Sequence, residues 1–213
     1  MCYHVFNRGN AQAEVFRTQD DYTSFLKLLA RASGRVPMRL LAYCLMPDHF
    51  HLVVWTFEDG DLGRWMQWLL TSHVRRYHRQ YGSTGRVWQG RFKAFPTQDD
   101  EHLLTVLRYV ERNPIRSATL DVREAQDWPW SSIGIGPPGV ERPPLDAGPV
   151  PRGDTWLASV NAPQPEAELA ALRESLQRSR PFGSPLWQQA TANRLGLEHT
   201  LRPRGRPKKR SEK

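Results

Sequence analysis

The sequence predicts an α+β domain whose elements follow the order βαββαβα, with an antiparallel sheet and with the helices packed on one face of it. Three observations predict this class. Short runs rich in β-branched and aromatic residues alternate with longer segments whose apolar residues recur at helical spacing. Two of the short runs are joined by only Met46-Pro47-Asp48, which suits an antiparallel hairpin. A proline, Pro114, ends the last long segment.

The first strand and the first helix are marked by the residues at their ends. Tyr3 to Phe6 is a β-type run that stops at a turn cluster, residues 7–10. Asp20 or Asp21 can cap the helix that follows, and Gly34 ends its pattern. The apolar stripe of this helix consists of Tyr22, Phe25, Leu26, Leu28, Leu29 and Ala32.

The hairpin strands cover residues 39–45 and 49–56, and a second helix covers residues 61–81. One side of this helix is apolar, and its other side is rich in arginine. The apolar side carries Met66, Leu70, Val74, Tyr77 and Tyr81.

The last strand and the last helix of the domain come next. Residues 86–95 form a strand in which alternation places Gln89, Arg91 and Lys93 on one face. The third helix begins near Asp99 and ends around residue 113, because the residue before a proline disfavours helical geometry.

Composition divides the chain into three parts. Residues 1–133 carry the periodic patterns and form the main domain. Residues 134–163 are rich in Pro and Gly and form a linker. Residues 164–213 hold one or two short helical patterns and a disordered basic tail, with too few large apolar residues for a core of their own.

The charge predicts a polyanionic partner. Lys and Arg number 30 against 22 Asp and Glu, a formal net charge of +8, and the basic residues cluster. Cys2 and Cys44 make no disulfide framework and no cysteine-based zinc site, which fits a reducing compartment. The longest apolar run, residues 40–46, cannot span a bilayer. We expect a cytoplasmic, nucleoid-associated protein with no membrane partner.

A pair of histidines is the first candidate for chemistry. Residues two apart in a strand project from the same face, so His49 and His51 present adjacent imidazoles, and Phe50, Leu52 and Val54 face the other way. Two imidazoles on one face make a metal pair. An isolated His-x-His also occurs in half-exposed sheets that bind nothing, so the pair needs a second observation.

The third helix supplies that observation. Its apolar stripe is formed by Leu103, Val106, Leu107 and Val110, and Tyr109 lies off that stripe. Asn113 is one helical turn further on, so its carboxamide and the phenol point into the same space. Asn113 can be an oxygen-donating metal ligand, or an ordinary polar residue that ends a helix before a proline.

These motifs together resemble the single-tyrosine HUH endonuclease superfamily, and within it the REP-associated tyrosine transposases. They span about the first 130 residues in the family's order. The motifs are Tyr3-His4-Val5-Phe6-Asn7-Arg8-Gly9, Ala42-Tyr43-Cys44-Leu45-Met46-Pro47-Asp48-His49-Phe50-His51-Leu52, Trp88-Gln89-Gly90-Arg91-Phe92, Tyr109-Val110-Glu111-Arg112-Asn113-Pro114 and Trp128-Pro129-Trp130-Ser131-Ser132.

The resemblance implies a ferredoxin-like sheet and a catalytic domain over residues 1–133. It implies His49, His51 and Asn113 as metal ligands and Tyr109 as a nucleophile that leaves a 5′-phosphotyrosine. The substrate it implies is single-stranded DNA, folded as hairpins of palindromic repeats, which the protein cuts and rejoins. We expect a monomer or a homodimer. Hard phosphate oxygens favour Mg²⁺ or Mn²⁺ as the cofactor.

Cations interleaved with aromatic residues are typical of single-strand binding. For the aromatic residues, ordinary core packing is an equal alternative. The candidates are Arg75, Arg76, Arg79, Arg86, Trp88, Arg91, Phe92, Lys93 and Arg116. In the tail, Arg204, Arg206, Lys208 and Lys209 resemble an AT-hook for A·T-rich duplex DNA, or serve as a nonspecific phosphate clamp.

Two other functions fit parts of this pattern. A sheet of this topology can bind nucleic acid without cutting it. A histidine-bound metal can also activate water for hydrolysis, with no covalent intermediate.

Overall fold

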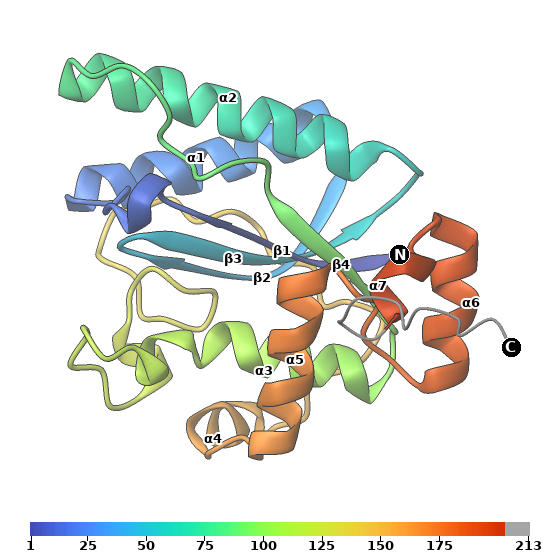
Figure 1. Ribbon diagram of the computed structural model, residues 1–213. Helices are drawn as coiled ribbons and strands as arrows, with labels where there is room; N and C mark the ends of the chain where they lie inside the picture. Colours follow the sequence, from blue (N-terminus) through green and yellow to red (C-terminus); the bar gives the residue numbers. More distant parts are fainter. Residues whose placement is uncertain (203–213) are drawn as a thin grey trace, which may run out of the picture.

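The computed structural model describes residues 1–202, and the AT-hook-like residues Arg204, Arg206, Lys208 and Lys209 lie outside this range. Four antiparallel strands form one sheet, in the order β2-β3-β1-β4 (Figure 1). The strands are β1 (Cys2–Arg8), β2 (Met38–Met46), β3 (His49–Thr56) and β4 (Lys93–Thr97). The predicted order βαββαβα and the antiparallel sheet are confirmed.

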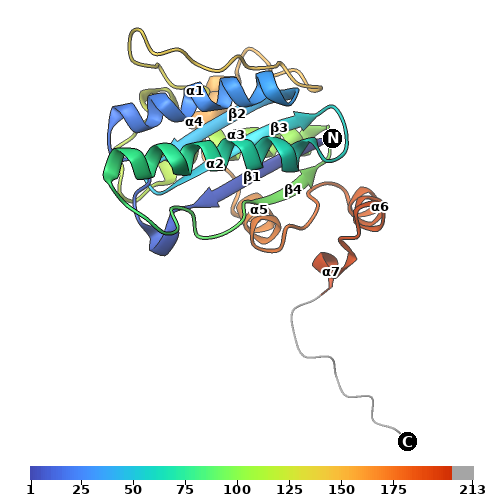
Figure 2. The same ribbon diagram turned by 90° about the horizontal axis from the view of Figure 1, so that it is seen from above.

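Helices cover both faces of the sheet, so the prediction that they pack on one face is wrong. Helices α1 (Gln19–Arg35) and α2 (Asp61–Tyr81) cover one face, and α3 (Glu101–Glu111) covers the other (Figures 1 and 2). The reason lies in β2 and β3. Leu45 and Leu52 pack under α1 and α2, whereas Cys44 and Val53 belong to the core under α3. A strand with an almost continuous apolar run is buried on both faces.

Local sequence explains where the helices begin and end. Thr18, rather than Asp20 or Asp21, is the N-cap of α1, and its backbone N–H donates to the Asp21 carboxylate at 3.0 Å. Helix α2 ends at Tyr81, and its C-cap is Gly82, whose φ of 56° is easy for glycine. Helix α3 stops at Glu111, and residues Asn113–Arg116 form a short 3₁₀ turn that contains Pro114.

The fourth strand begins later than predicted. It covers Lys93–Thr97 instead of residues 86–95, so Gln89, Arg91 and Lys93 do not share a strand face. Residues before it instead contact the end of β1, where the backbone N–H of Gln89 donates to the carbonyl of Arg8 at 2.9 Å. Pro96 is tolerated because β4 is at the edge of the sheet.

The segment after the main domain covers the other edge of the sheet. Residues 134–155 contain no regular helix or strand, yet the backbone N–H of Asp146 donates to the carbonyl of Leu40 in β2 at 2.8 Å. Arg142 donates to the hydroxyl of Tyr43 at 2.8 Å. These contacts shield the edge strand β2 from pairing with other chains.

Up to residue 202, four helices follow this segment: α4 (Trp156–Asn161), α5 (Glu166–Arg178), α6 (Pro185–Leu195) and α7 (Glu198–Leu201). Helix α5 packs against α3 and β4, on the same side of the sheet as α3 (Figure 1). Among the described helices, none is sufficiently long and apolar for a membrane span.

Glu111 joins α3 to the C-terminal segment, and its loss should destabilise the protein. It is 1% exposed and accepts hydrogen bonds from Ser132 Oγ at 2.8 Å and Trp156 Nε1 at 2.7 Å. Glu111→Ala should lower the free energy of unfolding by about 2–4 kcal/mol, since it removes a buried acceptor and leaves two partly buried donors unpaired. The matched control is Glu166→Ala, which removes an exposed ion pair with Arg173 and should change stability by less than about 1 kcal/mol. Urea unfolding measures both, and equal effects would contradict this role for Glu111.

His73 makes stability depend on pH. It is 2% exposed between Phe25 and Trp88, and burial lowers its pKa from 6.5 to about 3. The unfolded chain therefore binds more protons between these values, and stability falls as the pH falls through this window. The variant His73→Phe lacks the titrating imidazole. The slope of its unfolding free energy against pH should therefore be smaller by about 1.4 kcal/mol per pH unit between roughly pH 4 and 6. Urea unfolding at several pH values tests this, and an unchanged slope would count against it.

Candidate active site

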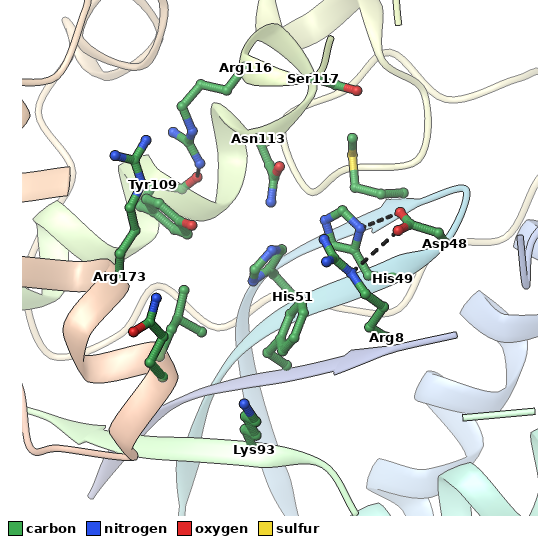
Figure 3. A pocket seen from close by; sticks show the side chains of 14 residues that line it. Arg8, Asp48, His49, His51, Lys93, Tyr109, Asn113, Arg116, Ser117 and Arg173 are labelled. Carbon is green, nitrogen blue, oxygen red and sulfur yellow. Dashed lines mark hydrogen bonds and ion pairs between the residues drawn. The ribbon is translucent and has the colours of Figure 1, made fainter. Parts of the chain in front are cut away.

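A cavity of about 500 Å³ lies on the α3 side of the sheet. The strand register explains why polar residues gather there, because Arg8 pairs with His49 and Phe6 pairs with Lys93 at one end of the sheet. Helices α3 and α5 supply the other walls (Figure 3). Of the predicted site residues, the cavity brings together His49, His51, Lys93, Tyr109, Asn113 and Arg116.

The two histidines lie side by side, each with a partner on Nδ1. Their ring centroids are 5.1 Å apart. His49 Nδ1 lies 2.5 Å from the Asp48 carboxylate, and His51 Nδ1 lies 2.9 Å from Nε2 of His4. Burial, followed by the nearby positive charges, lowers the pKa of His51 well below its usual value. Neutral imidazole is the form that binds a metal ion.

Tyr109 lies beside this pair. Its ring centroid is 5.8 Å from that of His51, in an edge-to-face arrangement, and its side chain is half-buried. The guanidinium of Arg116 stacks over the phenol ring at 4.1 Å from the centroid. Arg116 also donates to the backbone carbonyl of Tyr109 at 2.6 Å and to Gln164 Oε1 at 3.1 Å. The backbone of α3 and Gln164, which comes just before α5, thus hold Arg116 over the ring.

The donor set suits a divalent cation. Because the Nδ1 atoms of His49 and His51 face Asp48 and His4, their Nε2 atoms are the ones left to bind. The carboxamide of Asn113, which is 9% exposed, points toward the same space (Figure 3). Two imidazoles and one amide oxygen at this place could hold a divalent cation.

A second group with metal-ligating atoms lies at the start of α3. Ligand atoms of Asp100, Glu101 and His102 lie within 4.8 Å of one another. Asp100 is the N-cap of α3, and it accepts a hydrogen bond from the backbone N–H of His102 at 2.9 Å. Helix capping therefore accounts for Asp100.

The predicted DNA-binding residues do not form one surface. Lys93 and Arg116 line the cavity, whereas Arg75, Arg76 and Arg79 belong to α2, on the opposite face of the sheet. Arg76 is paired with Asp20 at 2.5 Å and with Asp21 at 3.3 Å. Arg86 and Arg91 are exposed in the loop before β4.

Trp88 is a core residue, so the expectation that it stacks on bases is corrected. It is 5% exposed, and its ring lies 5.1 Å from that of Phe50 and 5.2 Å from that of His73. Phe92 is half-buried against the same core. The Trp88 ring is therefore enclosed by core side chains and is not exposed for stacking on a base.

Several residues at the site were not predicted, and those with polar groups near the histidines or the phenol include His4, Arg8, Asp48 and Arg173. Arg8 and Arg173 line the cavity, and Arg8 pairs with Asp48 at 3.3 Å. The sequence held a signal for His4, which is a polar residue in a short apolar strand. It held none for Arg173, because nothing local shows that α5 returns to the site.

The matched sequence family decides which kind of protein this is. The family model described as "Transposase IS200 like" matches residues 1–113. The chain belongs to this family. The match includes His49, His51, Tyr109 and Asn113, and it ends before Arg116.

One relative of this IS200-like transposase is a REP-associated tyrosine transposase of Haemophilus influenzae. The two are 30% identical over 124 residues, which cover 54% of this chain and 69% of the relative. A solved REP-associated tyrosine transposase bound to a REP hairpin is 20% identical, with 62% of this chain and 74% of that chain covered and a TM-score of 0.48. A transposase structure from Deinococcus radiodurans is 16% identical. The similarity covers 52% of this chain and 88% of that chain, with a TM-score of 0.40.

Proposed function

We propose that this transposase is a metal-dependent endonuclease and strand transferase that acts on single-stranded hairpins of palindromic repeats through a 5′-phosphotyrosine. The observation that carries the proposal is the shared cavity, in which the phenol of Tyr109 lies beside His51 and which Asn113 and His49 also line (Figure 3). The kinship with a REP-associated transposase of Haemophilus influenzae supports a repeat hairpin as the substrate.

Cationic side chains around the cavity suit a phosphodiester. Arg8, Lys93, Arg116 and Arg173 come from four different elements and line the same space. Arginine and lysine neutralise phosphates and position a strand without reading its sequence. Arg173 belongs to the C-terminal segment, so we include this segment in the DNA-binding site.

His49, His51 and Asn113 would hold the Mg²⁺ or Mn²⁺ ion. Bound there, the ion draws negative charge from the non-bridging phosphate oxygens. Asp48 and His4 keep the two imidazoles oriented through their Nδ1 atoms. Arg116 keeps the phenol ring in place and stabilises negative charge that develops on it.

The chemical step exchanges one phosphodiester for another. The oxygen of Tyr109 forms a bond to phosphorus as the bond from phosphorus to the 3′ oxygen breaks. The phenol loses a proton and the leaving 3′ oxygen gains one, so the products are a 5′-phosphotyrosine and a free 3′-hydroxyl. Attack by a 3′-hydroxyl on the phosphotyrosine reverses the exchange and joins DNA. Because the number of phosphodiester bonds is conserved, ATP is not required.

The experiment is incubation with labelled single-stranded repeats from the source genome, with Mn²⁺ or with EDTA, followed by a denaturing gel. The proposal predicts a protein–DNA band that forms only with the metal and only with oligonucleotides that fold as hairpins. A scrambled oligonucleotide of equal composition is the control. Cleavage without a covalent band would support hydrolysis by metal-activated water, and binding without cleavage would support a non-catalytic module.

A further inference from the structure

His4 is a buried imidazole that lies behind the candidate metal ligand His51. It is 1% exposed, and its Nε2 atom lies 2.9 Å from His51 Nδ1. The ring of Phe95 packs against it at 4.9 Å. His51 lines the cavity, whereas His4, which contacts Nδ1 of His51, is not among the residues that line it.

The hydrogen bond between His4 and His51 can run in two directions, and each direction fixes a tautomer. If His4 donates, His51 carries its own proton on Nε2 and has no lone pair there for a cation. If His51 donates from Nδ1, its Nε2 is free to bind a cation, and His4 carries its proton on Nδ1.

The surroundings of His4 indicate its role. Within residues 1–202, no hydrogen-bond partner reaches its Nδ1 atom. A buried polar atom without a partner is costly, and an apolar residue could fill this place beside Phe95 without that cost. Packing alone therefore does not explain a histidine here, and the bond to His51 does.

The neighbouring ligand His49 has an acceptor at the equivalent nitrogen. The Asp48 carboxylate can only accept when ionised, so His49 donates from Nδ1. Asp48 has 27% of its side chain exposed, and water helps to solvate its charge. The position of His4 is almost fully buried, where a carboxylate would be poorly solvated. A neutral imidazole can accept a hydrogen bond there without a buried charge.

We propose that His4 is a positioning residue that accepts the Nδ1 proton of His51 and so holds His51 in the tautomer that can bind the cation. The proposal rests on the proposed function only in taking His51 as a cation ligand. It assigns to His4 no contact with DNA or with the reacting atoms.

The test reads the tautomer directly in the metal-free protein. Long-range ¹H–¹⁵N correlation spectra of protein labelled with ¹⁵N-histidine distinguish the Nδ1–H form from the Nε2–H form, and His51→Gln identifies the signals of His51. We expect the Nδ1–H form of His51 in the wild type and a substantial Nε2–H population in His4→Leu. His4→Gln, whose carbonyl oxygen can accept, should restore the Nδ1–H form.

Metal affinity is the second readout and needs no DNA. Calorimetric titration with Mn²⁺ should give binding roughly 10- to 100-fold weaker in His4→Leu, as expected for loss of a group that orients a ligand. Binding to His4→Gln should be close to that of the wild type. The matched control is His73→Leu, which removes another buried imidazole whose Nδ1 atom lacks a partner, from the opposite face of the sheet. It should leave the His51 tautomer and the Mn²⁺ affinity unchanged.

An Nε2–H form of His51 in the metal-free wild type would overturn the proposal, and so would unchanged Mn²⁺ affinity in folded His4→Leu. If His4→Leu does not fold, the wild-type spectrum and the spectrum and Mn²⁺ affinity of His4→Gln still test the proposal. Failure of the proposed function is a separate result. The protein would then show the expected tautomer and Mn²⁺ affinity without forming any covalent bond to DNA.

Discussion

Replacing Tyr109 with phenylalanine should abolish the covalent protein–DNA product while the hairpin still binds. The phenol oxygen is the proposed nucleophile, and removing a nucleophile costs at least about 10³-fold in rate. The ring remains, so the stacking of Arg116 at 4.1 Å and the edge contact with His51 persist. A denaturing gel measures adducts, and fluorescence anisotropy measures affinity for the hairpin, which should change only a few-fold.

The control for this variant is Tyr81→Phe. Tyr81 ends α2 on the opposite face of the sheet, where its hydroxyl donates to Asp21 at 2.6 Å. Its loss should affect stability and leave adduct formation intact. Adducts at the wild-type level in Tyr109→Phe would reject Tyr109 as the nucleophile.

Alanine at either His49 or His51 should remove both metal binding and cleavage. Each change deletes one of two adjacent imidazoles in the donor set, so we expect Mn²⁺ affinity to fall at least about 100-fold. Cleavage at a fixed Mn²⁺ concentration should fall by at least the same factor, because the charge on the phosphate is no longer offset. Calorimetry without DNA and cleavage assays with DNA measure the two effects separately.

His102→Ala is the matched control, since it removes a histidine from the other group of ligand atoms, at the start of α3. It should leave Mn²⁺ binding and cleavage nearly unchanged. If His102→Ala abolished Mn²⁺ binding and the His49 and His51 variants retained it, the metal would be at the start of α3 and the assigned site would be wrong.

Sequence periodicity predicted the parts of the fold that local patterns determine. The boundaries of α2 and β3 agree with the structure at both ends, since each begins and ends where its apolar pattern does. The alternation in β3 also placed Phe50 and Leu52 on the face away from the two histidines, as observed. Tyr109 lies off the buried stripe of α3, as its helical position predicted.

Features that depend on distant contacts could not be predicted from local patterns. The loop before β4 looked like a strand because Val87 and Trp88 are β-formers, but these residues pack into the core beside α2. The pairing of His4 with His51 depends on the register between β1 and β3. The position of Arg173 depends on how α5 packs against α3, some 60 residues along the chain.

The most direct test of the account is to identify the amino acid that becomes bonded to DNA. Trypsin cuts after Arg108 and Arg112, so the adduct should yield the peptide Tyr109-Val110-Glu111-Arg112 after nuclease digestion. Tandem mass spectrometry should place a nucleotide, bonded through its 5′ phosphate, on Tyr109. A nucleotide on any other residue, or cut DNA with no modified peptide, would contradict the account.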